Sequence, residues 1–128
     1  MSDATVAEFM TSPVLTVTAD ELTLDVGAAM ADQSIKSVVI VDETCRPKGI
    51  LTSTDYVEMT ADGVNPTETT VGEHMTKDIV TASPETGLSM AASQMRTNDI
   101  SHVPVVDDEG QVTGILSATD LTSYLASD

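Results

Sequence analysis

The chain has 128 residues, 41% of them hydrophobic, which fits a compact globular domain and not a disordered segment. Its formal net charge of -16, from 21 acidic and only 5 basic residues, argues against nucleic acid and anionic membranes as partners, because both are bound by clustered lysine and arginine. The central aliphatic runs are too short to span a bilayer and no basic, apolar leader opens the chain, so we expect a cytoplasmic protein.

The elements follow one another in the same order twice, because the chain aligns with itself without a gap at an offset of 65 residues. Each copy predicts a short helical turn, an extended segment, a helix, a buried strand, a turn, a second strand and a final helix. In the first copy these are residues 6–10, 14–17, 23–33, 37–41, 42–48 and 50–51, with the last helix starting near Ser53. In the second they are residues 71–75, 79–82, 88–97, 102–106, 107–113 and 115–116, with the last helix starting near Ala118.

This order predicts an α+β fold made of two β-α-β-β-α repeats. We place the first repeat at residues 1–63, a linker with the turn-forming Asn65-Pro66 pair at 64–67, and the second repeat at 68–128.

The densest repeated motif closes each copy, as Gly49-Ile50-Leu51-Thr52-Ser53-Thr54-Asp55 and Gly114-Ile115-Leu116-Ser117-Ala118-Thr119-Asp120. It places Thr52 and Ser117 at the N-cap of a helix, where free N–H groups and the helix dipole favour an anion such as a phosphate. A carboxylate three residues later suits the two hydroxyls of a ribose. The same spacing also describes a capping box, which would need no ligand, so both interpretations stay open.

The chain resembles a tandem pair of cystathionine-β-synthase (CBS) domains, also called a Bateman module. The resemblance rests on Val-x-Glu-x-Met-Thr at residues 6–11 and 71–76, on Ile-Ser-His-Val-Pro-Val-Val-Asp at 100–107, and on Gly-h-x-(Ser/Thr)-x-x-Asp in both copies. It implies two repeats packed sheet to sheet about a pseudo-two-fold axis, with adenine-containing ligands in two clefts between them.

The resemblance also implies which residues bind the ligand. Asp55 and Asp120 would hold the ribose hydroxyls, and four hydroxyl residues beside them would contact ribose or phosphate, namely Thr52, Thr54, Ser117 and Thr119. The base would be flanked by Thr16, Val17, Ser37, Val38 and Val39 in one site and by Thr81, Ala82, His102, Val103 and Pro104 in the other. The two copies differ most at residues 37–39 and 102–104, so we expect sites alike in form and unequal in affinity.

The resulting hypothesis is a regulatory, non-catalytic module that senses AMP, ADP, ATP or S-adenosylmethionine, with no required cofactor. The strong negative charge favours a ligand of modest charge, AMP or S-adenosylmethionine, over a triphosphate. We expect a homodimer, with an interface near Tyr56, Met59, Leu121 and Tyr124, that signals to an effector protein in trans. The alternative is a structural homodimerisation module without a physiological ligand.

Catalytic and metal-binding functions receive no support from the remaining reactive residues. His74, His102 and Cys45, the single cysteine, lack the spacing of a metal site, and no nucleophile, base and orienting group occur together. The acidic, lysine-poor composition instead resembles that of proteins from salt-loving microbes, in which high salt screens self-repulsion, so we predict a halophilic protein.

Overall fold

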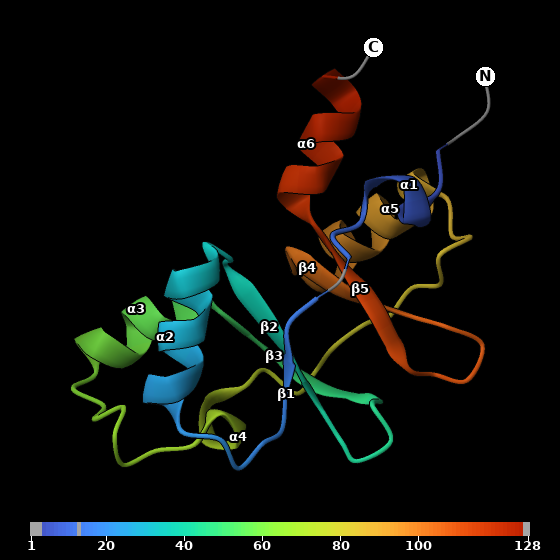
Figure 1. Ribbon diagram of the computed structural model, residues 1–128. Helices are drawn as coiled ribbons and strands as arrows, with labels where there is room; N and C mark the ends of the chain where they lie inside the picture. Colours follow the sequence, from blue (N-terminus) through green and yellow to red (C-terminus); the bar gives the residue numbers. More distant parts are fainter. Residues whose placement is uncertain (1–3, 13, 127–128) are drawn as a thin grey trace. The chain divides into compact units, whose positions relative to one another are not determined.

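The computed structural model describes residues 4–12 and 14–126 and confirms the α+β class and the repeated order of elements (Figure 1). The first half contains α1 (Val6–Phe9), β1 (Thr16–Val17), α2 (Thr23–Gln33), β2 (Ser37–Val41), β3 (Pro47–Thr52) and α3 (Ser53–Ala61). The second half contains α4 (Val71–His74), α5 (Leu88–Asn98), β4 (His102–Val106), β5 (Val112–Ser117) and α6 (Ala118–Ala126). No helix within these described ranges has the length and apolar character needed to cross a membrane.

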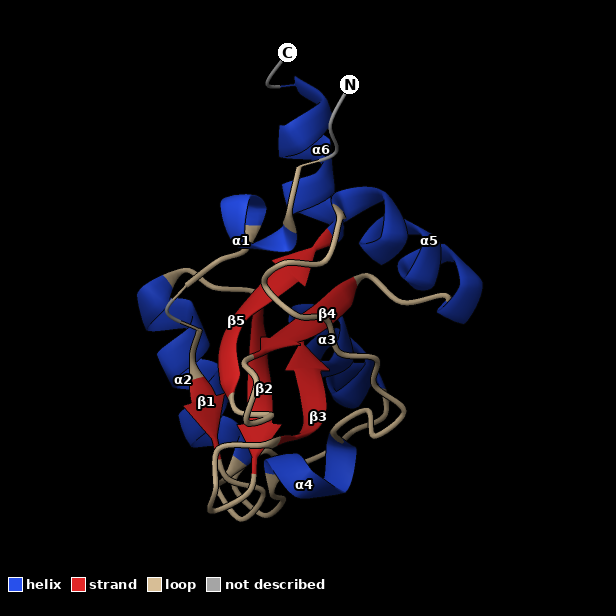
Figure 2. Cartoon of the chain, turned by 90° about the vertical axis from the view of Figure 1, so that its right-hand side faces the viewer, coloured by secondary structure: helices blue, strands red, loops and turns tan. Residues whose placement is uncertain are grey.

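The chain forms two compact units, and their limits differ from those of the sequence repeats. The first-sheet unit comprises Leu15–Ile79, and the second-sheet unit combines the segment up to Val14 with the residues from Val80 onward. Helix α1 therefore belongs to the same unit as β4 and β5, whereas α4 belongs with β1, β2 and β3 (Figures 1 and 2). Each unit thus takes its short helix from the other copy of the duplicated sequence.

Backbone hydrogen bonds attach the short helices to their units. In the second-sheet unit the Val6 N–H donates to the carbonyl of Thr86 over 2.8 Å, and Thr11 pairs with Ile115 on β5. In the first-sheet unit the equivalent residue, Thr76, pairs with Ile50 on β3. These pairs put a third backbone segment directly beside each hairpin. This segment lies close to the motif glycines Gly49 and Gly114.

The core of each unit lies between its hairpin and its two longer helices. In the first-sheet unit the alternate strand residues Val38, Ile40 and Leu51 are buried and belong to one cluster with Val26 and Met30 of α2. The second-sheet unit repeats this cluster with Val103, Val105 and Leu116 against residues of α5. The short aliphatic runs of the sequence predict buried strands, and β2 is buried continuously from Val38 to Val41.

The extended segment before each long helix is the main point at which the two units differ. In the first-sheet unit β1 pairs in parallel with β2, and the Val39 N–H donates to the carbonyl of Leu15. In the other unit Pro104 replaces Val39 and has no N–H to donate, so only the single bridge between Ala82 and Val105 remains. The strand predicted at 79–82 is therefore reduced to one bridge.

The second strands are longer than predicted. β3 begins at Pro47 and β5 at Val112, because the hairpin continues past Gly49 and Gly114 with a register shift near its turn end. Pro47, Gly49 and Gly114 are residue types typical of turns, and they hid the continuation of the strands.

Candidate functional site

The two repeated motifs fold into matching junctions between a strand and a helix. At the start of α3 the Thr52 N–H donates to Oδ2 of Asp55 over 2.8 Å, and the Asp55 N–H donates to Oγ1 of Thr52 over 3.3 Å. At the start of α6 Ser117 and Asp120 make the same reciprocal pair, at 2.8 and 3.2 Å. Both motifs are thus capping boxes, as the spacing predicts, and both predicted N-cap residues hold that position.

Each junction keeps polar groups that capping does not use. Within the described part of the chain, the carboxylates of Asp55 and Asp120 accept hydrogen bonds only through Oδ2. The Oδ1 atom of each aspartate therefore remains available to a ligand. The N–H groups of Thr54 and Thr119 likewise have no acceptor among residues 4–12 and 14–126. A carboxylate oxygen next to an unpaired N–H at a helix N-terminus can bind a vicinal diol and an anion together.

Two further capping boxes in the chain show what capping alone looks like. At α1 and α4 the carboxylates of Glu8 and Glu73 accept from the N–H groups of Thr5 and Thr70, as the aspartates do at the junctions. The N–H groups of both glutamates donate to the threonine carbonyls instead of the hydroxyls. The N–H and hydroxyl of Thr70 hold the pKa of Glu73 below its ordinary value. Both boxes use glutamate, the usual residue for this position, whereas both junctions use the shorter aspartate. The repeated substitution of aspartate at the junctions is a difference that capping does not require.

Strand register decides which of the predicted base-flanking residues face the same way as the capping side chains. Ser37 pairs with Thr52 and Val39 with Ile50, so these side chains share one face of the hairpin. Val38 points to the opposite face and belongs to the core cluster beneath α2. Only backbone atoms of Val38 are therefore available to a ligand on the face of Thr52.

The second-sheet unit has the same arrangement with different side chains. His102 pairs with Ser117 and Pro104 with Ile115, while Val103 is fully buried in the core cluster. The residues proposed from the extended segments before α2 and α5 also divide into buried and accessible side chains. Val17 and Ala82 are buried in the two cores. Half-buried Thr16 and exposed Thr81 keep accessible side chains. All sixteen predicted residues thus fall into two matching sets of eight, one in each unit.

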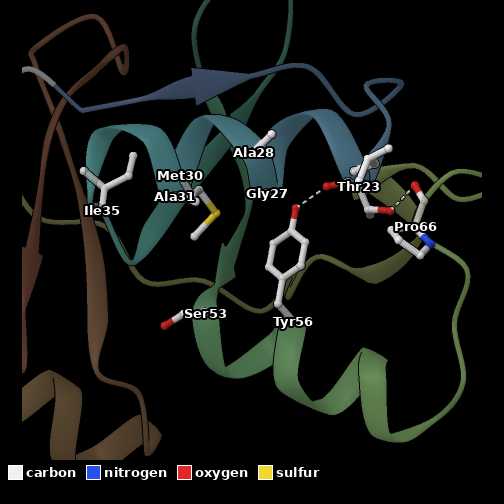
Figure 3. A pocket seen from close by; sticks show the side chains of 10 residues that line it. Thr23, Gly27, Ala28, Met30, Ala31, Ile35, Ser53, Tyr56 and Pro66 are labelled. Carbon is white, nitrogen blue, oxygen red and sulfur yellow. Dashed lines mark hydrogen bonds between the residues drawn. The ribbon is translucent and has the colours of Figure 1, made fainter.

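A feature that the site prediction did not include is an apolar groove of about 440 Å³ between α2 and α3 (Figure 3). Tyr56 projects from α3 across the groove and donates through its hydroxyl to the carbonyl of Thr23 over 2.7 Å. Burial raises the pKa of the Tyr56 phenol to about 12. None of the side chains that line this groove is charged: Thr23, Leu24, Gly27, Ala28, Met30, Ala31, Ile35, Ser53, Tyr56 and Pro66.

A smaller groove of about 300 Å³ occupies the equivalent place between α5 and α6 and also lacks charged side chains. Leu121 and Tyr124 line it, as Tyr56 lines its counterpart, and Tyr124 packs edge-on against Phe9 at a ring-centroid distance of 5.1 Å. Helical spacing of these apolar residues was the sequence signal for both grooves.

Comparison with known proteins places this geometry in a family. The family model described as "CBS domain" matches residues 6–61 and 71–127. An uncharacterised protein of Methanopyrus kandleri, MK0525, is 30% identical over 122 residues, which cover 94% of this chain and 62% of that protein. The chain therefore spans less than two thirds of the length of this relative.

Solved structures show the same fold. The CBS domain pair of protein MJ0100, in complex with 5′-methylthioadenosine and S-adenosyl-L-methionine, has a TM-score of 0.88, 27% identity, and coverage of 98% of both chains. The CBS domain protein PAE2072 from Pyrobaculum aerophilum, complexed with AMP, has a TM-score of 0.84 and 20% identity, covering 98% of this chain and all of that one. Because the family model matches both repeats and most of the chain, the chain belongs to the CBS domain family.

Proposed function

We propose that this chain is a regulatory module that binds an adenosyl ligand at the junctions that precede α3 and α6. The observation that carries the proposal is the unused pair of groups at each junction, Oδ1 of the aspartate and the N–H of Thr54 or Thr119. Asp55 and Asp120 accept hydrogen bonds from the ribose hydroxyls. The N–H groups and hydroxyls of Thr54 and Thr119 bind the 5′ substituent.

The bound forms of related proteins support this class of ligand. The MJ0100 domain pair carries 5′-methylthioadenosine and S-adenosyl-L-methionine, and PAE2072 carries AMP, so an adenosine group is common to all three ligands. In a chain of net charge -16, a triphosphate would meet strong repulsion. We therefore propose AMP, 5′-methylthioadenosine or S-adenosylmethionine as the ligand class, in preference to ATP.

The regulatory mechanism we propose is a population shift. A ligand that binds one conformation of the module more tightly than another shifts the equilibrium between them by at most the ratio of the two affinities. The effector that reads the favoured conformation would be a separate protein bound in trans.

Thermal unfolding in molar KCl tests the ligand class. An adenosyl ligand at 100 times its dissociation constant is expected to stabilise the chain by about 2.7 kcal/mol. Asp55→Asn and Asp120→Asn should each reduce this shift and the double variant should abolish it, because asparagine can keep the cap while it loses the charged acceptor for a diol.

Glu73→Gln is the matched control, since Glu73 also accepts a hydrogen bond from an N-cap N–H and has no proposed ligand. It should leave the ligand-induced shift intact. The proposal fails if no adenosyl compound shifts the unfolding of the wild-type chain, or if the double aspartate variant responds as the wild type does.

We further propose that two copies of the chain associate through the two apolar grooves. Leu24 is 46% exposed and lines one groove, and Leu125 is 75% exposed and lines the other. With 21 acidic and 5 basic residues, two copies repel each other over most of their surface. The charge-free grooves are where association buries apolar area without burying a carboxylate.

A Leu24→Asp variant tests this dimer by analytical ultracentrifugation. The substitution puts an acid at the second residue of α2, where it suits the helix dipole, so the fold should persist while the dimer dissociation constant rises at least about tenfold. Val57→Asp is the control, because Val57 is 69% exposed on α3 and lies outside the groove. A wild-type chain that is monomeric at high concentration, or equal dimerisation of Leu24→Asp and wild type, would contradict the proposal.

A further inference from the structure

A side-chain hydrogen bond joins the first turns of α3 and α2 in the first-sheet unit. Tyr56 directly follows Asp55, and its hydroxyl donates to the carbonyl oxygen of Thr23 over 2.7 Å (Figure 3). Burial raises the pKa of the phenol to about 12, so the hydroxyl keeps its proton at neutral pH and remains a donor. The residue next to the proposed ribose-binding aspartate therefore attaches α3 to a second helix.

The surroundings of the phenol ring fit this bond. A β-carbon at Gly27, one turn after Thr23 on α2, would stand 3.0 Å from Cε1 and 3.3 Å from Cζ of Tyr56. These separations are shorter than the roughly 3.5–4.0 Å at which carbon atoms pack best, so glycine leaves the ring room to reach its acceptor. Thr23 is itself held in place, because it is fully buried and its Oγ1 donates to the carbonyl of Pro66 over 2.9 Å.

The second-sheet unit lacks the donor for such a bond. At an offset of 65 residues, leucine and alanine replace the three residues of the contact, as Leu88, Ala92 and Leu121. Leu121 has no hydroxyl and packs against the apolar core cluster of its unit. Helix α6 instead makes an aromatic contact, between Tyr124 and Phe9 of α1. The duplication therefore provides one proposed site beside a Tyr56-type bond and one without it.

The bond bears on ligand binding because it acts on the turn that carries the proposed ligand groups. Asp55 and the N–H of Thr54 lie within two residues of Tyr56 on the same helix. Helix α3 has nine residues, and a helix of this length depends on tertiary contacts for its order. A ligand that needs the ordered turn binds with an apparent affinity reduced by the fraction of the chain in that conformation.

We propose that Tyr56 is a positioning residue of the first-sheet site, and that its hydrogen bond to Thr23 holds Asp55 and Thr54 in the arrangement that binds the ligand. This inference rests on the proposed function, because it concerns the same junction before α3. The second-sheet site, with Leu121 at the equivalent position, does not depend on such a bond.

Isothermal titration with AMP and with 5′-methylthioadenosine tests the role of Tyr56 one site at a time. Asp120→Asn leaves the first-sheet site to be measured, and Asp55→Asn leaves the second-sheet site. In the Asp120→Asn background, Tyr56→Phe should raise the dissociation constant about three- to tenfold, the size expected for one lost hydrogen bond. In the Asp55→Asn background the same substitution should leave the dissociation constant unchanged. All titrations use one KCl concentration at which every variant is folded, so that screening is equal.

Gly27→Ala supplies a second perturbation of the same contact. In the Asp120→Asn background it should also weaken binding, because the added methyl group displaces the Tyr56 ring. Combined with Tyr56→Leu, which gives the first-sheet unit the residue found at Leu121, it should add no further loss. An equal loss in the presence and absence of the tyrosine ring would contradict the proposed contact.

Amide hydrogen exchange distinguishes positioning from general stabilisation. Tyr56→Phe should speed exchange of the Asp55 N–H, which donates to Oγ1 of Thr52, more than exchange of the Val39 N–H within the sheet. A bond that only stabilises the fold would lower the unfolding temperature and leave both dissociation constants unchanged. That result would overturn the role of Tyr56 while the proposed function stands. Failure of the wild-type chain to bind either compound would instead overturn the proposed function itself.

Discussion

Replacing Leu51 or Leu116 with alanine is expected to lower the free energy of unfolding by about 2–5 kcal/mol. Both side chains are fully buried, and each belongs to the core cluster of its own unit. Truncation removes one methine and two methyl carbons from a packed interior and leaves a cavity that the neighbouring residues fill only in part. Since each leucine directly precedes an N-cap residue, the loss should also loosen the proposed site.

Chemical denaturation at constant KCl measures this loss for both variants. Val57→Ala is the control, because a side chain that is 69% exposed should change the stability by no more than about 0.5 kcal/mol. A cost below about 1 kcal/mol for both leucine variants would show that these side chains are not packed as described.

Replacing Gly49 or Gly114 with alanine is expected to destabilise the chain by about 1–3 kcal/mol, because a β-carbon has no room at either position. At Gly114 it would stand 2.8 Å from the carbonyl oxygen of Thr11 and 2.9 Å from the sulfur of Met10. At Gly49 the corresponding backbone contact, with the carbonyl oxygen of Thr76, is also 2.8 Å. A methionine can move aside, but these carbonyl oxygens belong to residues paired with β5 and β3.

A double variant separates the two contacts. If the backbone contact dominates, Gly114→Ala combined with Met10→Ala should recover none of the stability lost in Gly114→Ala. Recovery in the double variant would identify the methionine as the obstacle. The motif glycine would then be explained by side-chain packing and not by the approach of a third backbone segment.

The sequence predicted the elements well because the two copies support each other. The predicted helix at 23–33 coincides with α2, and the strands at 37–41 and 102–106 coincide with β2 and β4. The exchange of α1 and α4 between the units could not be predicted, because a repeat shows which residues are alike and not which residues pack together. The weak pairing near Ala82 was predictable, since Pro104 has no N–H to donate.

The junctions were predictable in chemistry but not in geometry. Spacing alone identified Thr52 and Ser117 as N-caps, and the structure confirms both. It could not show that the N–H groups of Thr54 and Thr119 lack an acceptor among the described residues, whereas the equivalent N–H groups of Ala7 and Gly72 in the two pure caps donate to backbone carbonyls. This difference separates a pure cap from a binding site. Strand alternation could have shown that the side chain of Val38 faces away from those of Ser37 and Val39.

The most direct test of the central claim is a titration of the ¹⁵N-labelled chain with AMP, followed by NMR of the backbone amides. We expect saturable shifts that are largest at Thr54 and Thr119, whose N–H groups have no acceptor among the residues the structure describes. Absence of any saturable shift would contradict ligand binding at the junctions. So would shifts confined to the groove around Tyr56, because the ligand would then bind away from both junctions.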